Sequence, residues 1–93
     1  MIQDSKIQEA LEMIKYNVFS WRMCEWGYVK EYDKAKARMR RFVAHVSTIE
    51  NAAIRTALRN LWTLRCKEAQ EFIDGKRPDY TEQKNEYMAI IAS

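Results

Sequence analysis

The sequence predicts an all-α protein, a small antiparallel bundle of three long helices and a short C-terminal helix. Apolar residues recur every three to four positions through most of the chain, which is typical of amphipathic helices. Two glycines and one proline in 93 residues are too few for the many turns of a β-sandwich. Chains of this length hold one hydrophobic core, so we expect a single helical domain spanning residues 1–93.

The first two helices are predicted from their capping residues and their apolar stripes. The first begins after Asp4 or Ser5, either of which can cap exposed backbone N–H groups, and runs to about Trp26. Gly27 ends or bends it, and a second helix is expected at 28–46. Each carries an apolar stripe that we assign to the core. These stripes comprise Ile7, Leu11, Ile14, Val18 and Trp21 on the first helix and Val29, Tyr32, Ala35, Met39, Phe42, Val43 and Val46 on the second.

The third and fourth helices are predicted from two capping signals and one stop signal. Residues 47–50 fit a capping box, in which Ser47 and Glu50 satisfy each other's backbone donors at the start of the third helix. That helix ends near Asp74, because Gly75 suits the left-handed residue after a helix and Pro78 blocks continuation. Residues 79–82 form a similar cap for a last helix that ends near Ser93. The expected core residues are Ile54, Leu58, Leu61, Trp62, Ala69, Phe72 and Ile73, then Tyr87, Met88 and Ile91.

Several classes of function are disfavoured by residues that the chain lacks. A zinc site needs about four close Cys or His ligands, whereas this sequence has the distant Cys24 and Cys66 and a single His45. It has no glycine-rich phosphate loop and no recognisable triad. We therefore expect no enzymatic activity, no metal and no cofactor. Neither a membrane span nor a secretory signal is recognisable, so we expect a cytoplasmic protein with free thiols and no membrane partner.

A second apolar face on the first helix exceeds what one core stripe requires. It lies roughly opposite that stripe and consists of Tyr16, Phe19, Met23 and Trp26. Aromatic side chains each carry about 150–250 Å² of buriable surface, so this face exposed would rival the largest apolar patches of monomers. We expect it to be covered, either because the helix is central in the bundle or because the face is an interface with a second copy or another partner.

A basic stripe on the second helix is the main candidate binding surface. Its members, Lys30, Lys34, Arg38, Arg41 and His45, are expected opposite the core face. Residues 28–46 contain six Lys and Arg against two acidic residues, so the excess charge of the whole chain, +3, lies on this helix. The stripe is either a solvated face, with His45 as an exposed residue at the helix end, or a docking surface for phosphate or an acidic protein.

Two charged residues fall on otherwise apolar faces. Glu25 continues the stripe of the first helix, and Arg65 lies among the core positions of the third. Burying either charge alone would be costly, which favours a buried ion pair between Glu25 and Arg65. The alternatives are exposure of Glu25 at a helix end and an Arg65 that anchors a ligand in a cavity.

Together these features favour a small non-enzymatic binding protein of inhibitor or adaptor type, such as phages and other mobile elements encode. It would form a homo-oligomer through the aromatic face and dock an acidic protein partner on the basic stripe. The alternative is a nucleic-acid or anionic-nucleotide binding protein that uses the same stripe, with Arg55 and Arg59 as supports. A third possibility is a structural subunit whose basic face is incidental.

Overall fold

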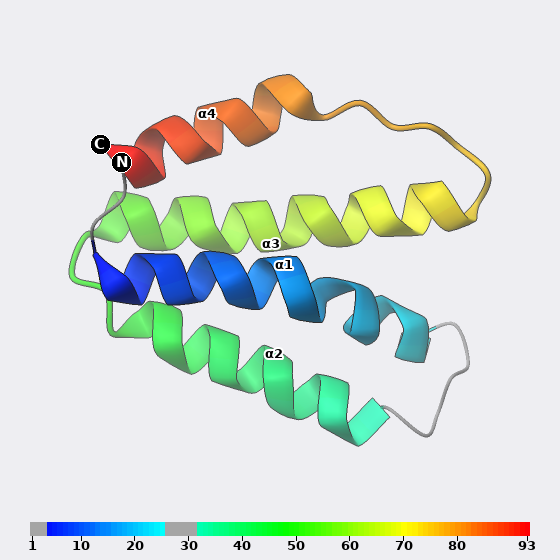
Figure 1. Cartoon of the computed structure of the whole chain (residues 1–93), viewed down its shortest axis with the longest axis horizontal. Coiled ribbons are helices and arrows are strands. Elements are labelled where there is room, and N and C mark those ends of the chain that lie inside the picture. The colour runs from blue at the N-terminus through cyan, green and yellow to red at the C-terminus, as the bar shows by residue number, and fades with distance from the viewer. Residues whose placement is uncertain (1–3, 26–31) are drawn as a thin grey trace.

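The computed structural model describes residues 4–25 and 32–93, with side chains at 4–15, 33–34, 36–72 and 74–93. This part of the chain consists of four α-helices and contains no strand. The helices are α1 (Ser5–Glu25), α2 (Tyr32–Ser47), α3 (Ala52–Ile73) and α4 (Thr81–Ala92). Successive helices run in opposite directions (Figure 1), which confirms the predicted antiparallel bundle of three long helices and one short helix.

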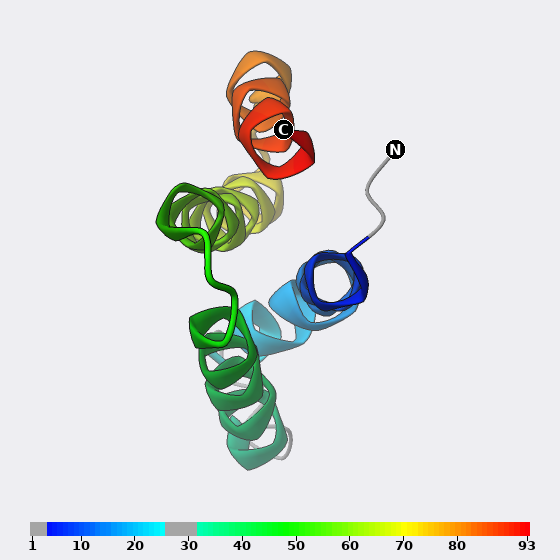
Figure 2. The same ribbon diagram turned by 90° about the vertical axis from the view of Figure 1, so that its left-hand side faces the viewer.

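The four helices form an open arrangement. α1 packs against both α2 and α3, whereas α4 packs against α3. Viewed along the helices, α4 and α2 lie at opposite ends of the molecule, with α3 and α1 between them (Figure 2). The molecule is therefore a flattened slab of 37 × 29 × 18 Å, and α4 depends mainly on α3 for its position.

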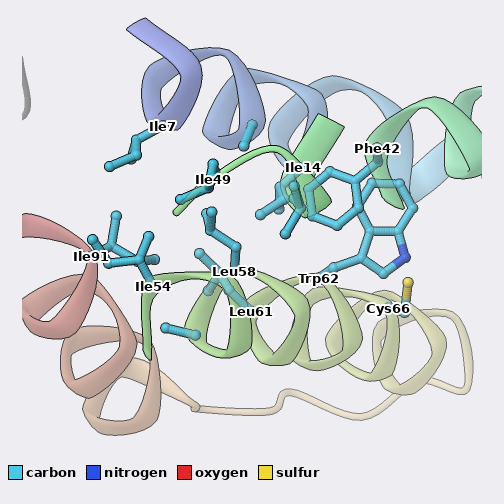
Figure 3. Close-up of a cluster of buried hydrophobic side chains, with 13 residues drawn as sticks. Ile7, Ile14, Phe42, Ile49, Ile54, Leu58, Leu61, Trp62, Cys66 and Ile91 are labelled. Carbon is cyan, nitrogen blue, oxygen red and sulfur yellow. The ribbon is translucent and has the colours of Figure 1, made fainter. Parts of the chain in front are cut away.

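The hydrophobic core lies where α1, α2 and α3 converge, and Ile91 of α4 closes one end of it (Figure 3). Stacking of Phe42 on Trp62, with ring centroids 4.4 Å apart, joins α2 to α3. Leu58 is fully buried beside them. The buried residues are Ile7, Ala10, Ile14, Phe42, Val46, Ile49, Ile54, Ala57, Leu58, Leu61, Trp62, Cys66 and Ile91.

Two residues that we expected in the core are exposed. Phe72 is 67% exposed, because the 12-residue α4 covers only part of the 22-residue α3 and leaves its C-terminal end open (Figure 1). Val43 is 48% exposed, because α2 is buried along the single edge that carries Phe42 and Val46. Other predicted core side chains lie outside the described residues, namely Val18, Trp21, Val29, Tyr32, Ala35 and Ile73.

The start of α3 also differs from the prediction. Asn51 is the N-cap, and its side-chain oxygen accepts a hydrogen bond of 3.1 Å from the Ile54 N–H. Ser47 instead ends α2, where its hydroxyl donates to the Ala44 carbonyl, so the capping box at 47–50 is wrong. The reason is that Ile49 is buried in the core. The chain therefore turns at this residue, and the next helix begins only after Asn51.

The segment between α3 and α4 follows the predicted stop signal of α3, but the predicted cap at residues 79–82 differs, because the N-cap of α4 is Tyr80 and has no side-chain capping hydrogen bond. Gly75 adopts a positive φ of 83°, and the Lys76 N–H donates to the Glu71 carbonyl in the pattern of a Schellman motif. At the start of α4 the Asp79 carboxylate accepts hydrogen bonds from the backbone and the hydroxyl of Thr81. The hydroxyl bond is the main reason that the pKa of Asp79 lies below its ordinary value of 3.8.

We predict that truncating a buried side chain lowers the free energy of unfolding more than truncating an exposed one. Leu58→Ala removes a fully buried side chain and should cost about 2–5 kcal/mol in the free energy of unfolding. Phe72→Ala removes a mostly exposed side chain and should cost less than about 1 kcal/mol. Urea denaturation followed by circular dichroism measures both, and equal losses would contradict the described core.

A second pair of variants distinguishes the observed cap of α3 from the one that the sequence suggested. Asn51→Ala should cost about 1 kcal/mol, because the Ile54 N–H loses its partner. Ser47→Ala should change stability by a few tenths of a kcal/mol, as is usual for an exposed surface residue. The same denaturation experiment measures both variants. A larger loss of stability in Ser47→Ala than in Asn51→Ala would support the predicted capping box instead.

The contact between Asp79 and Thr81 at the start of α4 predicts a specific acid sensitivity. Because folding lowers the pKa of Asp79, the ionised carboxylate stabilises the native state at pH values above about 4. This contribution is lost as the pH falls through the lowered pKa. Asp79→Asn removes the titrating group, so the free energy of unfolding of this variant should fall less steeply between pH 4 and pH 2 than that of the wild type. Identical slopes would show that the Asp79–Thr81 contact does not form in solution.

Candidate functional site

The basic stripe of α2 is partly described by the structure. Lys34 and Arg41 are exposed and Arg38 is half-buried, whereas Lys30 lies outside the described residues. We refer to Lys34, Arg38 and Arg41 as the α2 basic face. Arg40 is also exposed, on the other flank of the helix. Because α2 carries Asp33 as its one acidic residue, the cations of this helix have little compensation from within it.

His45 does not behave as an exposed end of this stripe. Its side chain is only 16% exposed, and its Nε2 lies 2.7 Å from the backbone carbonyl of Lys6 in the first turn of α1. A carbonyl only accepts, so Nε2 is the donor and carries the hydrogen. The carboxylate of Glu9 lies 3.9 Å from the same nitrogen. His45 therefore ties the last turn of α2 to α1 and is not a free binding residue.

The α2 basic face lies beside the buried edge of α2, which corrects our expectation that it lies opposite the core. At about 100° per residue, its members point about 90° away from the direction of Phe42 and Val46. His45 extends the same line and contacts α1, which shows that this flank of α2 borders α1. A partner bound to the α2 basic face would therefore lie along the edge where α2 meets α1.

Some cations elsewhere in the described structure make internal contacts. The Arg55 guanidinium donates hydrogen bonds to the carbonyls of Ile49 and Glu50, which lie in the turn between α2 and α3. In contrast, Lys34, Arg38, Arg40 and Arg41 make no ion pair or hydrogen bond through their side chains with any described residue. Arg55 is therefore not available to support nucleic-acid binding as we expected, whereas Arg59 is exposed.

Arg65 occupies an environment that the sequence did not indicate. Its side chain is 40% exposed, not buried, and its Nη1 lies 3.6 Å from Glu68 one turn further along α3. Lys84 of α4 contacts the other oxygen of the same carboxylate. The side chain of Glu25 lies outside the described residues, so its contact with Arg65 stays a prediction. The i,i+3 spacing of Arg65 and Glu68 was readable in the sequence, whereas Lys84 is brought close by the packing of α4 on α3.

A second polar cluster holds the segment before α4 against α3. The Tyr80 hydroxyl donates to both carboxylate oxygens of Glu71 at 2.8 Å, and this bond is the main reason that the pKa of Tyr80 is raised above 10.0. The Lys67 ammonium lies 5.4 Å from the centre of the Tyr80 ring, within reach of a cation–π contact. These residues have a structural role, and sequence reasoning assigned them none.

The remaining expectations concern the aromatic face, metals and membranes. Tyr16, Phe19 and Met23 belong to α1, but their side chains, like Trp26, lie outside the described residues. Self-association through this face therefore stays a prediction. No group of three or more His, Cys, Asp or Glu residues suited to a metal ion occurs in the part of the chain that the structure describes. Nor does any helix within that part have the length and apolar character to cross a membrane.

Comparisons with protein-family models, curated proteins and solved structures found no match to this chain. Its function is therefore inferred from the surfaces described above. Of these, the α2 basic face carries cations without described counter-ions, and the polar clusters on α3 carry cations that are already paired.

Proposed function

We propose that the protein is a small non-enzymatic binding protein, of inhibitor or adaptor type, whose α2 basic face docks an acidic protein surface in the cytoplasm. The observation that supports this proposal is the grouping of three cations without described partners on one face of α2, in contrast to the paired cations of the α3–α4 contact. Arg55, Arg65 and Lys84 have internal partners, whereas Lys34 and Arg41 are exposed without them. Complementary charge across an interface favours encounter and sets the orientation of the partners.

The surface between these cations suits the close approach of another chain. Ala37 and Ala44 are exposed on the outer side of α2, with Lys34 and Arg41 on one flank and Arg40 on the other. Small side chains allow a partner backbone to come near the helix, and the flanking cations could then pair with its carboxylates. An acidic helix or extended segment laid along α2 would satisfy both features.

Nucleic acid is the alternative ligand for the α2 basic face. The short length of this face favours nucleic acid less than an acidic protein. Lys34 and Arg41 are seven residues apart, which is about 10 Å along a helix axis. Three cations over this length would contact about three phosphates, fewer than the six to ten that make binding to DNA strong. If the protein also self-associates, as the aromatic face of α1 predicts, each copy would present one such face.

Charge reversal on α2 tests the proposal. The double variant Lys34→Glu/Arg41→Glu should lose at least tenfold in affinity for the acidic partner, because attraction becomes repulsion. Lys76→Glu/Arg77→Glu makes the same change in net charge at exposed positions between α3 and α4 and should bind like the wild type. Affinity capture from the native host, with nuclease treatment and identification of the retained proteins, provides the measurement, and circular dichroism checks that each variant is folded.

The same capture experiment decides between the two ligands. We expect an acidic protein to be retained after nuclease treatment, with an affinity that depends weakly on salt. Binding that requires intact nucleic acid would support the alternative, as would a slope of log K against log salt near −2.7, from about −0.9 for each of three phosphates. Equal capture by both double variants would refute a role for the α2 basic face.

A further inference from the structure

Two adjoining pockets lie on a different part of the molecule from the α2 basic face: the larger is lined by α1, α3 and the segment between α3 and α4, and the smaller by α1, α3 and α4. Their volumes are about 410 and 320 Å³, within the range of small-ligand sites. They share Lys15 of α1 and Arg65 of α3, so they meet between these two helices. They exist because α4 packs on α3 away from α2, so that the bundle stays open on this side (Figure 2).

The smaller pocket has an apolar floor contributed by three helices. Leu61 comes from α3 and Met88 from α4, and the α1 residues are Leu11 and Ile14. Among the described residues its polar lining is basic, namely Lys15, Arg65 and Lys84. An apolar floor bordered by cations matches a ligand that combines an apolar body with a negative charge.

The charges at the meeting point of the pockets are unbalanced. Within the described part of the chain, Arg65 and Lys84 share the single carboxylate of Glu68, which leaves one surplus positive charge in this described cluster. A guanidinium has five N–H donors, and the Arg65 contact with Glu68 is made through its Nη1. The side chain of Arg65 is 40% exposed, and no other described residue accepts a hydrogen bond from its remaining donors. Arg77 lines the larger pocket and adds a further cation.

We propose that this is a binding site for an anionic amphiphile, a carboxylate that carries an unbranched apolar chain. The carboxylate accepts hydrogen bonds from Arg65 and Lys84 and completes a cluster of two cations and two anions with Glu68. The chain lies over Leu61 and Met88 in the smaller pocket. A simple inorganic anion would leave this apolar floor exposed, and a cationic amphiphile would be repelled by the surplus charge.

Isothermal titration calorimetry with decanoate at pH 7.5, below its micelle concentration, tests the site. We expect saturable binding of decanoate and none of decyltrimethylammonium, which has the same chain and the opposite charge. Octanoate should bind about tenfold more weakly, because two fewer CH₂ groups are buried. Arg65→Gln should weaken decanoate binding about tenfold through loss of charge-assisted hydrogen bonds, and Met88→Gln should weaken it through loss of apolar contact.

Matched variants keep the outcome interpretable. Arg59→Gln removes the same charge from an exposed position of α3 that lines neither pocket, and it should bind decanoate like the wild type. Arg65→Lys keeps the charge and should bind more tightly than Arg65→Gln, which separates ligand binding from any effect on folding. The α2 variant Lys34→Glu/Arg41→Glu should bind decanoate normally, so this site and the α2 basic face can fail independently.

Three results would overturn the proposal. The first is the absence of saturable decanoate binding to the wild type. The second is equal binding of decanoate and decyltrimethylammonium, which would show a purely apolar surface. The third is undiminished decanoate affinity in both Arg65→Gln and Lys84→Gln, which would exclude the Arg65–Glu68–Lys84 cluster as the site of the carboxylate.

Discussion

Burial of the apolar side of α3 is the constraint on which the rest of the structure depends, because α1, α2 and α4 all pack against this helix. Leu58 and Trp62 lie at the centre of the contact, and the stacking of Trp62 on Phe42 places α2. Since α4 is short and rests mainly on α3, it cannot close the bundle over α1. The open side and the exposed end of α3 at Phe72 both follow from this difference in length.

Whether a charged side chain is paired depends on whether another helix packs beside it. On α3 and α4 the polar side chains meet across a helix–helix contact, so Glu68 joins Arg65 to Lys84, and Glu71 holds Tyr80. α2 lies at the edge of the slab, and its outer side meets no other helix (Figure 2). Lys34 and Arg41 therefore keep their charge available to a partner, whereas the described cluster around Glu68 retains one surplus charge beside an apolar floor. The two proposed sites also differ in shape, since the α2 basic face is convex and the site beside Glu68 is a pocket.

Local signals in the sequence were reliable where the tertiary structure made no competing demand. Gly75 ends α3 as predicted, because the left-handed conformation is a property of the backbone alone. At residues 47–50 the local pattern suggested a capping box, yet burial of Ile49 took precedence and moved the cap to Asn51. A single hydrogen bond at a helix end contributes less than burial of a large apolar side chain, which explains the outcome.

The sequence by itself determined the helical class, the order and approximate length of the helices, and which helix carries the unpaired positive charge. Periodicity shows which residues share a face of one helix, so Lys34, Arg38 and Arg41 could be grouped in advance. It does not show which neighbour covers that face, or how far along the helix the cover extends. Only the tertiary structure decided that His45 contacts α1, that Phe72 is exposed, and that Lys84 meets Glu68 beside Arg65. These features depend on how helices distant in the chain pack on one another: α2 on α1 for His45, and α4 on α3 for Phe72 and Lys84.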